Sequence, residues 1–261
     1  SDHDRSFGTV VFPFKKWSIR LIERANLAYA RDEKTANEVG SFVKVTSDMA
    51  FGLPYDASRF KLDDRKKIGI NVSSLLWDDN TRGRFGLSID YKGFYRKIIN
   101  YLIEQNEYQI HIIPHVIDSK NPMAAENDYR ICQELKQEFG DKVELAPAFS
   151  TAIEAKSYIS NMDVFMGSRM HSTIGAVSSG VATIPISYAY KFEALYSHIN
   201  YPYVLHATQI DTDEALKLVK QWIGEPEKLR KKGAESVSIA LKELENFKKD
   251  IKKSLENADL L

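Results

Sequence analysis

The chain has 261 residues and carries equal numbers of basic and acidic residues, 36 Lys plus Arg against 36 Asp plus Glu, so its formal net charge is zero. A balanced charge argues against nucleic acid as a partner, and against an anionic membrane held by the field of the whole protein. The hydrophobic fraction of 43% is ordinary for a packed protein, and no apolar run approaches the roughly 18 residues that a membrane-spanning helix needs. Any anionic ligand must therefore be held by local groups.

The single cysteine, Cys132, excludes an internal disulfide and predicts a buried thiol in a reducing compartment. No signal-peptide pattern opens the sequence, so we expect a cytoplasmic location. The first residues run within a few positions into the strand-like stretch Thr9 to Phe12, which is typical of the middle of a domain. We therefore expect the native N-terminus to lie upstream of this sequence.

Short β-branched runs alternate with stretches whose apolar residues recur every three or four positions, which is typical of a parallel sheet covered by helices. Residues 1–62 are interpreted as part of an N-terminal α/β domain. The expected strands there are 9–12 and 43–46, the expected helices are 16–28 and 34–39, and the charged stretch 56–67 has the composition of a linker.

A second series of strands and helices predicts a doubly wound, Rossmann-type domain over residues 63–225, followed by an amphipathic helix over residues 226–261 that packs back on the protein. The expected strands cover residues 67–73, 109–114, 142–145, 164–166 and 183–186, and the expected helices cover residues 90–105, 123–139, 151–160 and 172–179. Ligands of such sheets bind outside the carboxyl ends of the strands. The residues that follow each strand are therefore the candidates for a functional site.

The most informative stretch runs from Asp163 to Ala176, where an apolar strand is followed by a Gly-Ser turn and a helix of small residues. This arrangement directs backbone N–H groups and the positive end of the helix dipole at the sheet edge, which suits a phosphate or carboxylate. Arg169 adds a planar fork that can hold either anion in two places. His171 can exchange protons near neutral pH. On spacing alone, an alternative stays open in which Arg169 pairs with a core carboxylate and His171 only caps the helix.

Other strand ends supply candidate substrate-binding residues. Lys191 follows the strand 183–186 and can provide a second cation, and Tyr188 can stack on a sugar ring. His115 follows the strand 109–114, where a structural role and a site role fit equally well. The remaining candidates are Ser172 at the start of the small-residue helix, Asn71 and Ser73 at the first strand of the second series, and Arg82 and Arg84 as anion clamps in a loop, where exposure to solvent is the commoner outcome.

The run from Gly167 to Lys191 resembles the signature of the polysaccharide pyruvyl transferase family. The matching residues are Gly167, Arg169, His171, Ser172, Ala176, Gly180, Pro185, Ser187, Tyr188 and Lys191. Further motifs similar to those of the family are Pro13-Phe14, Arg31-Asp32-Glu33, Asp48-Met49-Ala50-Phe51, Gly69-Ile70-Asn71-Val72-Ser73 and Ile113-Pro114-His115-Val116.

The resemblance implies a GT-B-like architecture, with two Rossmann-like domains and a cleft between them, in which residues 63–225 bind the donor. It implies transfer of the enolpyruvyl group of phosphoenolpyruvate to two hydroxyls of a hexose, which forms a cyclic pyruvate ketal and releases phosphate. Arg169 would then hold the donor's carboxylate or phosphate, and His171 would be the acid or base at the enol ether.

The same resemblance implies two partners, phosphoenolpyruvate and a hexose-containing glycan or lipid-linked sugar. A lipid-linked acceptor would bring the protein into peripheral contact with a membrane. The chemistry needs no cofactor and no metal, and the sequence shows no metal-binding cluster.

Two other functions are compatible with these residues. A nucleotide-sugar glycosyltransferase would have the same fold, and a helix N-terminus beside an Arg serves a diphosphate equally well. A non-catalytic carbohydrate-binding protein is favoured if the N-terminal domain is incomplete in the cell.

Overall fold

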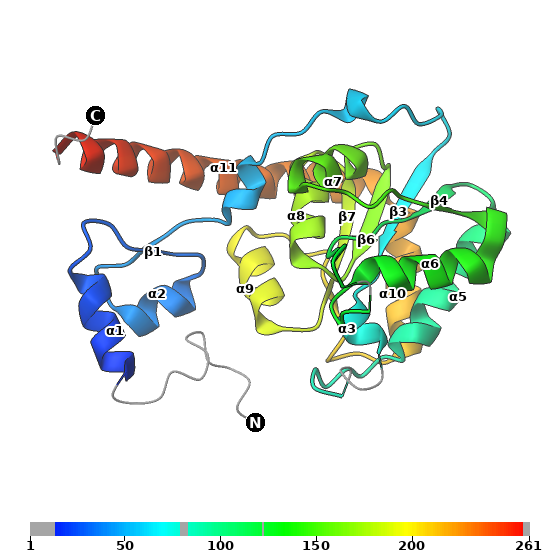
Figure 1. Cartoon of the computed structure of the whole chain (residues 1–261), viewed down its shortest axis with the longest axis horizontal. Coiled ribbons are helices and arrows are strands. Elements are labelled where there is room, and N and C mark those ends of the chain that lie inside the picture. The colour runs from blue at the N-terminus through cyan, green and yellow to red at the C-terminus, as the bar shows by residue number, and fades with distance from the viewer. Residues whose placement is uncertain (1–13, 79–82, 122, 258–261) are drawn as a thin grey trace.

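The computed structural model describes residues 14–78, 83–121 and 123–257 (Figure 1). Its central feature is a six-stranded sheet with the order β5-β4-β3-β6-β7-β8, in which every neighbouring pair is parallel. The strands are β3 (Lys67–Asn71), β4 (Gln109–Ile112), β5 (Val143–Leu145), β6 (Val164–Gly167), β7 (Ala182–Ser187) and β8 (Leu205–His206). The predicted α/β class with a parallel sheet is confirmed.

Helices connect and cover these strands. They are α3 (Ser74–Trp77), α5 (Tyr91–Gln105), α6 (Asp128–Phe139), the 3₁₀ turn η3 (Gly140–Lys142), α7 (Ala152–Ile159), α8 (Met170–Ser178), α9 (Tyr190–His198) and α10 (Thr212–Ile223). The sequence pattern predicted α5 to α8 and did not predict α3, α9, α10 or β8. Helix α6 begins five residues later than expected, because Asn127 caps it by accepting a hydrogen bond from the backbone N–H of Tyr129.

Alternate side chains of β6 enter two different apolar clusters. Val164 and Met166 belong to the larger cluster, which contains residues of α5, α6 and α10. Phe165 belongs to the smaller cluster, with Tyr158 and Ile159 of α7. Both faces of the sheet are therefore buried, which explains why its strands are almost continuously apolar. Each such side chain contributes about 1.5–3 kcal/mol by leaving water. The thiol of Cys132 is also fully buried in the larger cluster, as predicted.

The order of the strands places a topological switch point at the centre of the sheet. The chain passes from β3 outward through β4 to β5 and then returns to β6, which lies on the other side of β3. Asn71 and Gly167 are register partners at the carboxyl ends of β3 and β6. Doubly wound sheets bind ligands outside such a point. A side chain at Gly167 would not fit, since its Cβ would lie 2.9 Å from the Phe165 ring and 3.1 Å from the Asn71 Cβ.

A smaller α/β unit precedes this domain. Its elements are α1 (Phe14–Glu23), β1 (Tyr29–Ala30), α2 (Glu33–Val39) and β2 (Lys44–Val45), and the two strands pair in parallel. Helix α1 ends five residues earlier than predicted, and the expected strand at 9–12 lies outside the described residues. The segment that follows contains two 3₁₀ turns, η1 (Met49–Gly52) and η2 (Ala57–Arg59). The boundary at residue 62 stays a prediction.

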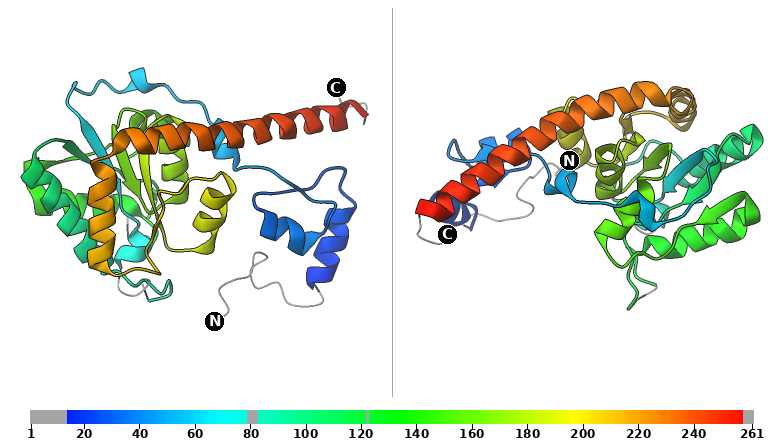
Figure 2. Two further views of the ribbon diagram at one scale, coloured as in Figure 1. Left: turned by 180° about the vertical axis from the view of Figure 1, so that it is seen from behind. Right: turned by 90° about the horizontal axis from the view of Figure 1, so that it is seen from above.

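The last helix, α11 (Pro226–Asn257), joins the two parts of the protein. Its part up to Leu244 packs on the sheet domain, where Leu229, Ala240 and Leu244 are buried. The rest of the helix extends beyond that domain and reaches the N-terminal unit (Figure 2). There the rings of Phe247 and Tyr29 meet edge to face, with centroids 4.8 Å apart. None of the described helices combines the length and the apolar character that crossing a bilayer requires.

Candidate functional site

Asn71 holds the loop in which Arg169 and His171 lie. Its Nδ2 donates to the backbone oxygen of Ile113 at 2.9 Å, and its Oδ1 accepts from the backbone N–H of Arg169 at 3.0 Å and from the Ser172 hydroxyl at 3.1 Å. Asn71 and Ser172 are fully buried. Both were predicted to bind substrate, and the structure places them where they connect the ends of β3 and β4 to the first turn of α8.

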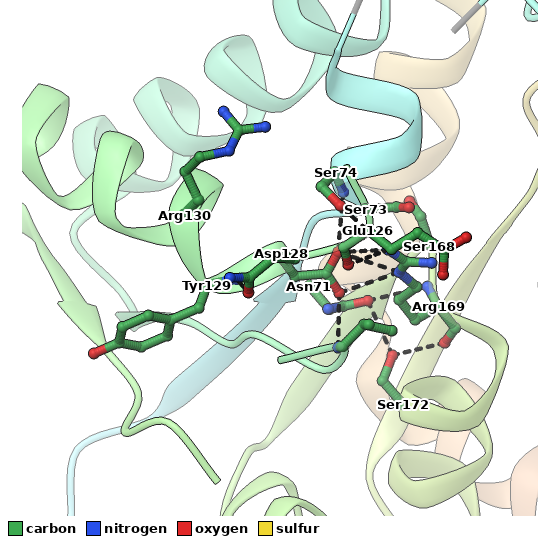
Figure 3. Close-up of polar contacts among 12 residues, drawn as sticks. Asn71, Ser73, Ser74, Glu126, Asp128, Tyr129, Arg130, Ser168, Arg169 and Ser172 are labelled. Carbon is green, nitrogen blue, oxygen red and sulfur yellow. Dashed lines mark hydrogen bonds and ion pairs between the residues drawn. The ribbon is translucent and has the colours of Figure 1, made fainter. Parts of the chain in front are cut away.

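The guanidinium of Arg169 forms a buried ion pair with Asp128, the first residue of α6 (Figure 3). Nη2 lies 2.8 Å from Oδ1, and Nε lies 3.1 Å from Oδ2. Burial would lower the pKa of the guanidinium, but the carboxylate outweighs it and raises that pKa above its ordinary value. Arg169 therefore pairs with a core carboxylate, which is the alternative that its spacing had left open.

Further contacts fix the position of the pair. Nη2 of Arg169 also donates to the Ser74 hydroxyl at 3.3 Å and to the backbone oxygen of Glu126 at 3.1 Å. Asp128 accepts from the backbone N–H groups of Ser74 and Val116, both at 3.0 Å. Within the described parts of the chain, Nη1 of Arg169 makes no hydrogen bond, whereas Nε and Nη2 are both engaged.

His171 lies in the first turn of α8 with 54% of its side chain exposed. Its Nε2 is 3.6 Å from Oδ2 of Asp48, and the same oxygen accepts from Nη1 of Arg31 at 2.8 Å. Burial alone would raise the pKa of the Asp48 carboxyl group. The contacts with His171, with the backbone N–H of Ala50 and with Arg31 outweigh burial and hold that pKa well below its ordinary value. Asp48 is therefore ionised at neutral pH.

Lys191 lies in the first turn of α9 and is exposed. Its pKa is lowered first by partial burial and then by the positive charges of Arg31 and Arg169. Arg31 and Arg169 therefore lie close enough to repel the Lys191 ammonium, and we refer to Arg31, Arg169 and Lys191 as the cationic cluster. A bound anion would relieve this repulsion.

A cavity of 450 Å³ adjoins His171 between η1, α7 and α8. Its walls are mostly apolar, and three nitrogen-bearing side chains, those of His115, Lys156 and His171, reach it. The apolar lining consists of Met49, Ala50, Gly52, Leu53, Pro54, Ala152, Ile159 and Gly175.

His115 and Lys156 both reach the cavity, but they differ in their hydrogen bonds and in their pKa values. Nδ1 of His115 is enclosed and has no partner among the described residues. Burial lowers the pKa of this histidine to about 4, so its ring is neutral at neutral pH. Nζ of Lys156 donates to the backbone oxygen of Leu53 at 2.7 Å, and burial lowers its pKa to about 8. In the sequence Lys156 stands among the apolar residues Ala155, Tyr158 and Ile159, which is the signal that could have indicated a buried lysine.

Four further residues were predicted to bind substrate, and they are Tyr188, Ser73, Arg84 and Arg82. The Tyr188 ring is buried and packs against Phe85 and Phe192, with centroids 5.1 and 5.5 Å away. The Ser73 hydroxyl is buried and lacks a hydrogen bond within the described residues. Arg84 is exposed, and Arg82 lies outside the described residues. The structure thus places Lys191 near Arg169, and His171 and His115 on the same cavity. In the part of the chain that the structure describes, no group of three or more His, Cys, Asp or Glu could hold a metal ion.

Comparison with known proteins gives one family. A family model described as polysaccharide pyruvyl transferase matches residues 15–190. No curated protein sequence matches the chain.

Several solved structures share the fold. One is a UDP-GlcNAc 2-epimerase from Neisseria meningitidis bound to UDP-GlcNAc, with a TM-score of 0.54 and 13% identity over 89% of this chain and 61% of that one. Another is an α,α-trehalose-phosphate synthase (UDP-forming) from Burkholderia vietnamiensis, with a TM-score of 0.56 and 9% identity over 94% of this chain and 64% of that one. A third is a trehalose-6-phosphate synthase, with a TM-score of 0.57 and 10% identity over 93% of this chain and 64% of that one.

Identities this low show a shared fold alone. The two synthases are GT-B glycosyltransferases, so the expected GT-B-like architecture is confirmed. The chain spans less than two thirds of the length of each of these three proteins.

Proposed function

The chain belongs to the polysaccharide pyruvyl transferase family, and on that premise we propose that it transfers the enolpyruvyl group of phosphoenolpyruvate to hexose hydroxyls of a polysaccharide or glycan precursor. The observation that carries the proposal is the position of His171. This accessible imidazole lies beside an apolar cavity and in the same loop as Arg169 of the cationic cluster. A proton carrier next to an anion grip is what addition to an enol ether requires.

The cationic cluster is suited to the donor's two anionic groups. Phosphoenolpyruvate carries a carboxylate and a phosphate on the same carbon atom, and the cluster offers Arg31, Lys191 and the Nη1 atom of Arg169. The Nε and Nη2 edge of Arg169 is already engaged by Asp128, so this arginine would contribute one donor atom and a fixed charge. The N-terminus of α8 adds a positive partial charge at the same place.

The proposed reaction begins with proton transfer from His171 to the methylene carbon of the donor. The neighbouring carbon then acquires oxocarbenium character, and a sugar hydroxyl attacks it. Phosphate departs with the electrons of the carbon–oxygen bond, and a second hydroxyl of the hexose closes the ketal. Of the two hydroxyl protons, one returns to His171 and the other leaves with phosphate, so the cycle needs no further reagent.

The direct test is release of inorganic phosphate from phosphoenolpyruvate in the presence of a panel of hexosides, with detection of the ketal by mass spectrometry. We expect acceptor-dependent phosphate release, and His171→Gln should lower its rate by at least about 100-fold while leaving a measurable residual rate. Absence of phosphate release with every acceptor, together with no binding of phosphoenolpyruvate, would refute the proposal.

Transfer from a nucleotide sugar is the second candidate, and the fold shared with a UDP-forming synthase favours it. The cationic cluster would also suit a diphosphate. Melting-temperature shifts separate the two, because phosphoenolpyruvate but not a panel of UDP-sugars should stabilise a pyruvyl transferase. A protein that binds only carbohydrate would respond to neither donor.

A further inference from the structure

Asp48 is the meeting point of the two parts of the protein. It follows β2 of the N-terminal unit and caps η1, where its Oδ1 accepts from the backbone N–H of Ala50 at 3.0 Å. Its Oδ2 contacts Arg31 of the N-terminal unit and His171 of the sheet domain. Its side chain is only 10% exposed. One carboxylate oxygen therefore joins the histidine proposed as acid to a cation proposed to hold the donor.

We propose that Asp48 is a positioning residue that orients the imidazole of His171 toward the donor. The inference rests on the proposed pyruvyl transfer for the reaction that it serves. Because Nε2 faces Asp48, Nδ1 is the ring nitrogen that exchanges the proton with the donor. A carboxylate that holds one nitrogen of a histidine fixes both the ring orientation and the site of protonation.

The segment around Asp48 is held firmly enough for this role. Lys156 donates to the backbone oxygen of Leu53, which ties the end of η1 to α7. On the other side, a Cβ added at Gly52 would lie 3.5 Å from the Leu244 side chain of α11. The turn that carries Asp48 is therefore enclosed between two helices, and the carboxylate cannot easily follow a displaced imidazole.

The charges that face His171 make Asp48 its counter-ion. His115 faces it from the end of β4, Lys156 reaches the same cavity from α7, and Arg169 precedes it in its own loop. Each of these side chains is neutral or positive at neutral pH. Among the residues that the structure describes, Asp48 is the only carboxylate within ion-pair distance of His171.

The decisive experiment is a double-mutant cycle on kcat with Asp48→Asn and His171→Gln. Asn keeps the shape of Asp and removes its charge. We expect Asp48→Asn to lower kcat by about 10- to 100-fold, a part of what a general acid contributes, without weakening phosphoenolpyruvate binding in calorimetry. In the His171→Gln background the same change should cost nothing more, because Asp48 acts through His171. An equal fold-loss in both backgrounds would mean that Asp48 has only a structural role.

A second measurement does not depend on activity. The Cε1–H resonance of His171, assigned by its absence in His171→Gln, should move in Asp48→Asn at pH 7. An unchanged resonance would overturn the positioning contact even in an active enzyme. A moved resonance in a protein without phosphoenolpyruvate turnover would instead refute the proposed function alone.

Glu243→Gln is a matched control. Glu243 on α11 contacts a different histidine, His198, at 3.0 Å, and accepts a hydrogen bond from the hydroxyl of Ser47, the neighbour of Asp48. This variant removes a carboxylate from a similar pair in the same region. It should leave both kcat and the His171 resonance unchanged. Asp48→Glu, which retains the charge, should recover part of the kcat lost in Asp48→Asn.

Discussion

Arg169 and Asp128 form an ion pair at the carboxyl edge of the sheet, with Nη2 and Oδ1 2.8 Å apart and the Asp128 side chain fully enclosed. Asp128 also accepts from two backbone N–H groups, those of Ser74 and Val116. The pair therefore orders the segments after β3 and β4 together with the loop that carries His171. Its loss should affect both the stability of the protein and the geometry of the site.

Asp128→Asn should lower the free energy of unfolding by about 3 kcal/mol, because it leaves a buried guanidinium without a counter-charge. Urea denaturation at pH 7 measures this. The control is Glu138→Gln, which breaks the exposed pair between Glu138 and Arg96 and should cost less than about 1 kcal/mol. Equal costs for the two variants would contradict the assignment of a special role to the buried pair.

Arg169→Lys should weaken phosphoenolpyruvate binding strongly. A single ammonium cannot satisfy Asp128 and also present a donor atom to the ligand, whereas the guanidinium can do both. Calorimetry on the folded variant measures the effect. An unchanged dissociation constant would show that Arg169 serves the protein interior alone.

His171→Ala should abolish turnover, with a loss of at least about 100-fold in kcat for the missing proton donor. More than half of this side chain is exposed, so the melting temperature should stay close to that of the parent protein. A folded variant that retained ordinary turnover would assign the proton transfer to another group.

The pH dependence of phosphoenolpyruvate binding should reflect the loss of the proton from the Lys191 ammonium. Its pKa is lowered by partial burial and by the charges of Arg31 and Arg169, so it loses its proton at a lower pH than an ordinary lysine. Phosphoenolpyruvate affinity should therefore fall on the alkaline side. In Lys191→Arg, which stays charged throughout, that fall should disappear. The same alkaline fall in both proteins would exclude Lys191 as its source.

His115→Gln should change how stability depends on pH. Burial lowers the pKa of His115 to about 4 in the folded protein, against 6.5 for a solvent-exposed histidine. As pH falls below 6.5, the unfolded chain takes up a proton before the folded one does, so the stability of the native state is full above 6.5 and is lost progressively toward pH 4.

This histidine contributes at most about 1.4 kcal/mol per pH unit to the slope of the unfolding free energy against pH. His111, whose pKa burial also lowers to about 4, adds a second contribution. Denaturant unfolding at pH 5 and pH 7 should therefore show a smaller difference in His115→Gln than in the parent. An identical difference would show that His115 does not titrate in this window.

Part of the fold was predictable because burial on both faces makes the strands of a parallel sheet apolar. The run Val164 to Met166 and the small-residue helix after it were recognised for that reason. Helix α3 has four residues, too few for a helical period to appear. Helix α10 has a clear apolar stripe and the N-cap Asp211, so its signal was present and was not used.

The site residues were predictable to the extent that they follow strands. Arg169, His171, Lys191 and His115 all do so, and the structure places them around one region of the molecule. Tyr188 follows a strand as well, but its ring packs between aromatic neighbours that come from α9 and from the loop before α5. A residue that follows a strand is expected at the edge of the sheet. Whether its side chain is accessible to a ligand depends on the neighbours that pack against it.

The sequence alone therefore determined the parallel sheet, the sheet edge at which a ligand is expected and the loop of Arg169 and His171, because these depend on local periodicity and on strand ends. Only the tertiary structure decided what those two side chains contact. Asp128 comes from the start of α6 and Asp48 from the turn after β2, segments distant in the sequence. No spacing rule links such positions, since they meet only when the chain has packed around the switch point between β3 and β6.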